Sequence, residues 1–149
     1  MFRCFKKPKG KETFVVPEVE MLKTGFSEIE IDIFNAINLH RDSVGIKKCI
    51  SNLKLSNISY HHNLFMIRER KVTHDGFPTR LAQTKDLCSN DWMGEILARG
   101  YTTANGVVKG WLKSITHRAI IESENPIFFG CSVAYDKKRK MYVTLLFMD

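Results

Sequence analysis

The sequence lacks the features that define several large classes of protein. It has no apolar run that approaches the ~20 residues of a membrane-spanning helix, no internal repeat and no low-complexity segment. Its N-terminus, MFRCFKKPKGKETF, is basic but has no apolar core like that of a secretory signal peptide. We therefore expect a chain that is cytoplasmic or particle-associated, or one that is secreted after removal of a leader.

The cysteines are few and widely spaced. The four of them (Cys4, Cys49, Cys88 and Cys131) include no CxxC pair and no spacing typical of metal ligands. This gives no indication of a zinc ribbon and only a weak indication of disulfides. Cys131 lies in the apolar run IFFGCSVAY, which predicts a buried thiol.

The composition is that of one folded domain. A chain of 149 residues is long enough for one ordinary domain and too short for two. With 44% hydrophobic and 26% charged residues, it can bury a core without the support of a metal or a disulfide.

Basic charge is concentrated at the N-terminus. Residues 1–25 hold six basic and three acidic residues, so this segment contributes +3 of the formal charge of +7. Such a tail favours an anionic membrane, nucleic acid or an acidic protein surface, and the alternative is a solvated tail without a partner. The residues predicted to bind a partner are Arg3, Lys6, Lys7, Lys9 and Lys11.

Hydrophobic periodicity predicts three helices. In FSEIEIDIFNAINLHRDSVG, apolar residues such as Ile33 and Ile37 recur at helical spacing, and Ser27 and Glu30 have the spacing of a capping box. LSNISYHHNLFMIRER and TTANGVVKGWLKSITHR show the same periodicity. Between these two, residues 72–92 contain Gly, Pro and Asn breaks that predict a long loop.

The strongest β pattern is at the C-terminus. IFFGCSVAY and MYVTLLFM are rich in β-branched and aromatic residues and flank the polar DKKRK, which predicts an antiparallel hairpin with a basic tip. Both strands are apolar at nearly every position, so helices should cover both faces of the sheet. MGEILARG adds a third predicted strand. The expected fold class is α+β, a three-layer α/β/α sandwich around a small antiparallel sheet.

Six segments together resemble a known family. NLHRDSVG, HHNLFM, THDGFPTR, GEILARGY, GWLKSITHR and FFGCSVAY with MYVTLLF occur in family-like order and spacing. They resemble the CAP superfamily of cysteine-rich secretory, antigen 5 and pathogenesis-related proteins, and within it the bacterial SCP-like branch. The likeness runs from about Phe26 to Phe147, which divides the chain into a basic tail, 1–25, and a CAP-like domain, 26–149.

The resemblance implies a central cleft with two histidines and an acidic residue, in which several relatives bind a divalent cation. Carried over to this sequence, these residues are His74, Glu95 and His117, and Zn²⁺ is the first candidate cation. Two positions depart from the animal and plant branch. Ser114 stands where a second glutamate is found there, and Ile96 stands where an asparagine commonly follows the first glutamate.

Side chains around this site have expected supporting roles. Ser114 and His117 are three residues apart on one predicted helix, but a serine nucleophile would also need an orienting acid and an oxyanion hole. Ser114 is therefore predicted to support His117 by a hydrogen bond. Arg80 and Arg118 could pair with Glu95 or a neighbouring carboxylate, and the favoured role is a salt bridge that anchors the loop. Trp111 is predicted to fill the space between helix and sheet.

Three functions follow from these residues. The first is a non-catalytic binding module with a cleft able to hold a divalent cation, which acts on a protein, lipid or cell-envelope partner. The second is a metal-assisted hydrolase in which a metal-bound water is the nucleophile and Glu95 is the base. The third is a structural component of a larger assembly, such as a virion, anchored by the basic tail.

Overall fold

The computed structural model describes residues 2–5, 23–87 and 92–149. Within them the chain forms five strands and five helices. In chain order these are β1 (Phe2–Phe5), α1 (Glu28–Ser43), β2 (Ile50–Ser51), α2 (Leu53–Glu69), α3 (Phe77–Gln83), β3 (Met93–Arg99), α4 (Ala104–Lys113), α5 (Ile115–Ile121), β4 (Phe128–Tyr135) and β5 (Met141–Met148). None of the helices in these ranges is long and apolar enough to cross a bilayer.

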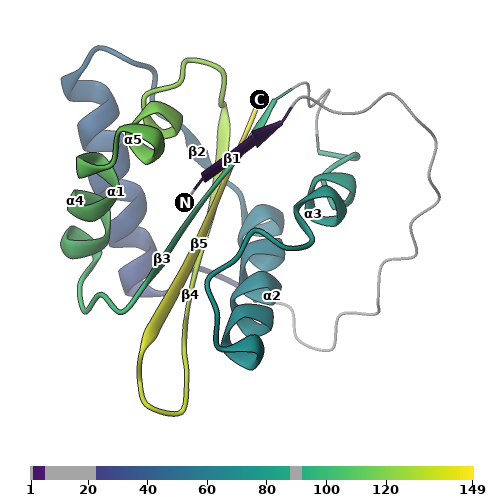
Figure 1. Ribbon diagram of the computed structural model, residues 1–149. Helices are drawn as coiled ribbons and strands as arrows, with labels where there is room; N and C mark the ends of the chain where they lie inside the picture. The colour runs from purple at the N-terminus through teal and green to yellow at the C-terminus, as the bar shows by residue number, and fades with distance from the viewer. Residues whose placement is uncertain (1, 6–22, 88–91) are drawn as a thin grey trace.

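The strands form one sheet between two layers of helices. Their order is β1-β3-β5-β4-β2, and all neighbours are antiparallel except β2, which runs parallel to β4. Helices α1, α4 and α5 cover one face, and α2 and α3 cover the other (Figure 1). The predicted three-layer α/β/α sandwich is confirmed.

Strand β5 shows why the C-terminal strands are apolar at nearly every position. All eight of its residues are buried, because it lies at the centre of the sheet with a helical layer on each face. Val143, Leu145 and Phe147 pack toward α1, α4 and α5. Leu146 and Met148 alternate with them and pack toward α2 and α3.

The predicted loop at residues 72–92 contains a short helix, so the expectation of an unstructured segment is wrong. Gly76 adopts φ 75° immediately before α3, and Pro78 lies in the first turn of the helix, where its missing N–H costs nothing. Phe77 and Leu81, four residues apart, are buried against the sheet. The Gly and Pro residues read as breaks are start signals of this helix.

The third predicted helix is two helices. Ser114 has an extended backbone, with φ −87° and ψ 119°, and separates α4 from α5. Ser114 and His117 are therefore not on a common helical face. The prediction that one continuous helix carries both residues is wrong.

Side chains of α1 and α2 bond to the backbone of β4. Ser59 Oγ donates to the carbonyl of Gly130 (3.0 Å), and Asn63 Nδ2 donates to the carbonyl of Ser132 (2.7 Å). The backbone N–H of Val133 donates to the buried carboxylate of Glu30 at 2.9 Å. The N–H of Val133 points away from β5, so its bond to Glu30 satisfies a group that β2, with only two residues, leaves unpaired. The carbonyls of Gly130 and Ser132 point toward β5, and their bonds to Ser59 and Asn63 tie α2 to the sheet.

Two parts of the segment predicted as a tail contact the domain. Strand β1 pairs with β3, and Arg3 stands opposite Glu95 in the register. The backbone N–H of Lys23 donates to Asn57 Oδ1, and its ammonium group forms an ion pair with Glu30. Lys6, Lys7, Lys9 and Lys11, predicted to bind a partner, lie outside the described residues.

Candidate functional site

Three of the predicted site residues form a buried ionic cluster, which consists of His74, Arg80 and Glu95. Glu95 lies on β3 and faces the α2–α3 layer, Arg80 lies on α3, and His74 lies in the segment just before α3. The His74 Nδ1–Glu95 Oε1 distance is 2.7 Å. Arg80 binds both carboxylate oxygens, with Nε 2.5 Å from Oε2 and Nη2 2.7 Å from Oε1. The arginine–carboxylate pair is thus bidentate.

Arg80 also anchors the backbone that carries His74. Its Nη1 donates to the carbonyl of Asp75 (2.7 Å), and its Nη2 donates to that of His74 (3.3 Å). Glu95 is 0% exposed, and His74 and Arg80 are each 6% exposed. Arg80 thus both pairs with Glu95 in the interior and anchors the segment before α3.

The partners of Glu95 keep it ionised. Burial by itself raises the pKa of a carboxyl group, but hydrogen bonds from His74 and Arg80, together with the charge of Arg80, outweigh burial and hold the pKa of Glu95 below its usual range. The carboxylate accepts, so His74 Nδ1 carries the proton of that bond. Both oxygens of Glu95 are engaged, because together they accept three hydrogen bonds from two side chains.

His62, on α2, is buried close to this cluster. Its Nε2–H donates to the carbonyl of Thr73 at 2.7 Å, and this bond ties α2 to the segment that leads to His74. Burial lowers the pKa of His62 to about 4, and the positive charge of Arg80 contributes in the same direction while Glu95 partly offsets it. His62 is therefore neutral in the folded protein at neutral pH.

The free energy of unfolding should fall by up to about 3 kcal/mol between neutral pH and about pH 4 because of His62 alone. In the unfolded chain this imidazole takes up a proton near its usual pKa of 6.5, whereas in the fold it stays neutral down to about 4. Its stabilising effect is complete above pH 6.5 and is lost as the pH falls through this interval. Urea unfolding at steps across the interval measures the slope.

The matched variants for this pH dependence are His62→Gln and His61→Gln. Glutamine at position 62 keeps an N–H donor for the Thr73 carbonyl but does not titrate, so most of the slope should disappear. His61 is its neighbour on the same helix and is only half-buried, so His61→Gln should retain most of the slope. An unchanged slope in His62→Gln contradicts the assignment.

His117 is on the opposite side of the sheet from the cluster. Along β3, Gly94 and Ile96 face α5, and a Cβ on Gly94 would lie 2.9 Å from the Ile120 side chain. Glu95, between them, faces the other layer. His117 is buried on α5 with Ile120 and Ile121. The structure therefore does not bring His117 to His74 and Glu95.

The predicted neighbours of His117 have other partners. The hydroxyl of Ser114 lies 3.0 Å from that of Thr116. Arg118 pairs with Glu122 (2.9 Å) on the surface, and the same carboxylate oxygen accepts from His40 Nε2 at 2.7 Å. Trp111 is 2% exposed, and its indole N–H donates to the carbonyl of Leu97 at 2.9 Å, so the predicted packing role of Trp111 is confirmed.

The residues in place do not fit the cation site that the resemblance implies. Among the residues that the structure describes, no three His, Cys, Asp or Glu side chains are grouped so that they could hold a metal ion. The guanidinium of Arg80 occupies the oxygens of Glu95 that a cation would need. One polar atom of the cluster, His74 Nε2, is buried without a hydrogen-bond partner in the described part of the chain. A single nitrogen is not a metal site.

The bond from His62 to the segment that leads to the cluster was not predicted from the sequence. Helical spacing places His62 correctly on the buried face of α2, but the bond to Thr73 joins residues eleven positions apart across a turn. The available signal was the histidine itself, because a buried imidazole needs a partner for its N–H.

With the fold and the cluster established, sequence comparison gives the class of the protein. Residues 34–147 match the family described as "CAP: Cysteine-rich secretory protein family". The match covers more than half of the chain, and the chain belongs to this family. The resemblance found from the six segments is therefore confirmed. No curated protein sequence matches the chain.

Solved structures show the same fold at low sequence identity. An outer surface protein from Borrelia burgdorferi is 20% identical with a TM-score of 0.73, and the match covers 87% of this chain and 98% of that one. An extracellular protein containing a SCP domain from Bacillus anthracis is 22% identical with a TM-score of 0.70, covering 80% of this chain and 39% of that one. A cysteine-rich secretory protein from Staphylococcus aureus is 18% identical with a TM-score of 0.68, covering 80% and 37% respectively.

Proposed function

We propose that this chain is a non-catalytic CAP-type interaction domain that acts on a protein, lipid or cell-envelope partner. The observation that carries the proposal is the state of Glu95. Its carboxylate is completely buried, with Arg80 donating to both oxygens and His74 donating to Oε1. A general base needs an oxygen that can reach the proton of a water or a substrate.

The cluster has a structural use that accounts for these residues. Arg80 joins β3 to α3 through Glu95 and joins the preceding segment through two backbone carbonyls. A hydrolase would have to break this bidentate pair in each cycle and expose a buried guanidinium. The interaction role is also in keeping with the neighbours described as an outer surface protein and as an extracellular protein.

Turnover assays with the whole chain test the proposal. Peptide and ester substrates are incubated with the protein, with and without added Zn²⁺, and a chelator-treated sample is the reference. We expect no turnover above the buffer rate in any of these samples. Hydrolysis that is lost both on chelation and in Glu95→Gln, with the variant shown to be folded, would establish the metal-assisted hydrolase instead.

The cation-holding cleft of the first predicted role and the predicted assembly role receive no support from the described residues. The cation-holding cleft needs a ligand set that is not assembled there. The assembly role depends on the basic tail, whose lysines at positions 6, 7, 9 and 11 lie outside those residues. Both therefore stay predictions from the sequence.

A further inference from the structure

Most of the net charge of the described domain lies at one end of the molecule. Residues 23–87 and 92–149 contain eighteen basic and twelve acidic residues, a net of +6. Eight basic residues occupy the β4–β5 turn, the end of β3 and the C-terminal end of α2, and we call this set the basic end. Its members are Arg68, Arg70, Lys71, Arg99, Lys137, Lys138, Arg139 and Lys140. Three acidic residues bond to members of this set (Glu69, Asp75 and Asp136), so the basic end carries +5 and the other residues in these ranges sum to +1.

The β4–β5 turn is held by its backbone and one carboxylate, not by its basic side chains. Asp136 Oδ1 accepts the N–H groups of Lys138 (2.9 Å) and Lys140 (2.8 Å). The N–H of Asp136 donates to the carbonyl of Lys140, and that of Arg139 donates to the carbonyl of Asp136. The side chains of residues 137–140 are thus free for another use, and all four are exposed.

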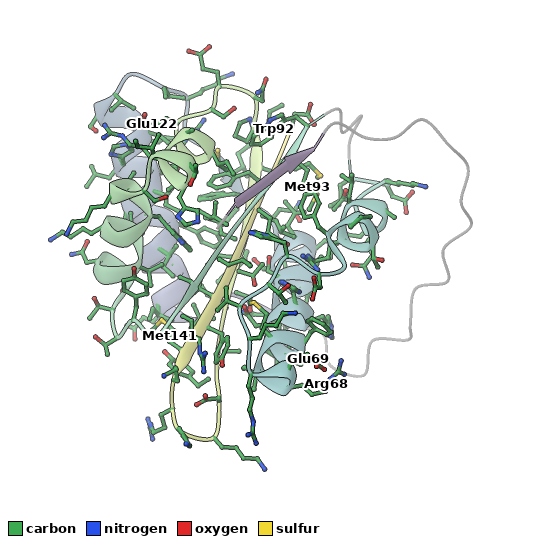
Figure 2. The ribbon with its side chains drawn as sticks, viewed as in Figure 1. Arg68, Glu69, Trp92, Met93, Glu122 and Met141 are labelled. Carbon is green, nitrogen blue, oxygen red and sulfur yellow. The ribbon has the colours of Figure 1, made fainter. Side chains whose placement is uncertain are left out.

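Packing brings two further elements to the same end. Arg99 lies over the ring of Tyr142, with Cζ 5.0 Å from the ring centroid, and the next residue, Gly100, bonds to the carbonyl of Met141. Met66, near the end of α2, packs on Tyr142 in one apolar cluster. Figure 2 shows Arg68 and Glu69 at the end of α2 and Met141 where β5 leaves the turn.

Most of these charges have no local counter-ion. Arg68 pairs with Glu69 (2.9 Å) and Lys71 with Asp75 (3.1 Å), both on the surface. The other six form no ion pair with any residue in the described ranges, and they are Arg70, Arg99, Lys137, Lys138, Arg139 and Lys140. Six unpaired cations at one end repel one another, and an external anionic surface would remove this cost.

We propose that the basic end docks on the anionic headgroups of a phospholipid bilayer, with the β4–β5 turn in first contact. The turn extends beyond the ends of the neighbouring helices, so a flat surface meets it before any other part of that end (Figure 1). Tyr135, which precedes the turn, is 54% exposed and is a residue type favoured at the membrane–water interface. The β4–β5 turn projects outward, whereas single-stranded nucleic acids are bound along grooves that carry several stacking aromatics.

This inference extends the proposed interaction role by naming a surface and a class of partner. It uses no residue of the cluster around Glu95. Catalysis at Glu95 would overturn the proposed function and leave the docking surface standing, and failure to bind lipid would do the reverse.

The experiment is vesicle co-sedimentation with the full chain. One set of vesicles is phosphatidylcholine alone, and the other contains equal parts of phosphatidylcholine and phosphatidylglycerol. The test variant carries Lys137→Gln, Lys138→Gln and Lys140→Gln, and it keeps Asp136 and the left-handed Arg139 (φ 61°) that shape the turn. The control removes the same charge elsewhere, with Lys47→Gln, Lys109→Gln and Lys113→Gln at exposed positions. Both variants retain the N-terminal lysines.

We expect binding to the anionic vesicles only, weakening as salt is added. The test variant should lose at least about tenfold in affinity, since each basic residue at an anionic surface contributes roughly fivefold, and the control should change by less than about threefold. An equal loss in the two variants shows a response to net charge and overturns the site. Absence of binding to anionic vesicles overturns it as well, as does tighter binding to duplex DNA or RNA that is sensitive to the same three substitutions.

Discussion

An Arg80→Leu variant should lose about 3–5 kcal/mol of unfolding free energy, because it leaves the carboxylate of Glu95 buried and without its cation. Glu95 is 0% exposed, and two of its three hydrogen bonds come from Arg80. His74 alone remains to hold the charge. Equilibrium urea unfolding at neutral pH measures the loss.

The double variant Arg80→Leu with Glu95→Leu is the matched control. It removes both charges, so most of the penalty for an unpaired carboxylate disappears and more than half of the lost stability should return. The loss in the single variant should also shrink in acid, where Glu95 can take up a proton and become neutral. A loss below about 1 kcal/mol in the single variant would mean that the pair contributes as little as a surface ion pair.

Gly130→Ala should cost more than about 3 kcal/mol or prevent folding, above the usual range for one added methyl group. A Cβ at this position would lie 2.2 Å from Leu55 Cβ and 2.5 Å from both the carbonyl carbon of Leu55 and the backbone nitrogen of Ser56. These atoms belong to the first turns of α2, so the whole helix would have to move away from β4. Thermal and urea unfolding measure the effect.

Gly25→Ala is the control for this substitution. No heavy atom lies within 4 Å of a Cβ built at position 25, and Gly25 is not among the residues with positive φ. The same chemical change should therefore alter stability by less than about 0.5 kcal/mol. Comparable losses at the two positions would show that the contact with α2 is not the cause.

These effects bear on function because both positions hold α2 and α3 against the sheet. Gly130 sets the distance between α2 and β4, and Arg80 ties α3 to β3. His74, Arg80 and Glu95, which the sequence predicts near a cleft, are part of that support in this chain. The surface that we propose for recognition, the basic end, lies outside this support and contains none of these residues.

Much of the fold could be read from local patterns. The capping interaction between Ser27 and Glu30 is present, with the N–H of Ser27 donating to the Glu30 carboxylate at 2.8 Å. The hairpin with a basic tip was predicted within a few residues, because strands buried on both faces are apolar throughout. Where local signals conflicted, the prediction failed: Gly76 and Pro78 were read as breaks, although a Pro in a first turn starts a helix.

The candidate site was predicted in part, and the missing part has a clear physical cause. His74, Arg80 and Glu95 were all named from the sequence, and the structure places them in contact. His117 was predicted with them. The side of the sheet on which His117 lies depends on the break at Ser114 and on the helical layer that α5 joins. Neither of these is encoded by spacing along the chain.

The amino-acid order was therefore sufficient for the longer helices and strands, the two-sided burial of the sheet and the family. The partners of the buried charges depended on contacts between distant segments. Periodicity reports which side of a helix or strand is apolar, because each residue's neighbours in the chain set that pattern. It does not report which layer packs on which face, and for Glu95 that choice selected Arg80 and His74 as partners and excluded His117.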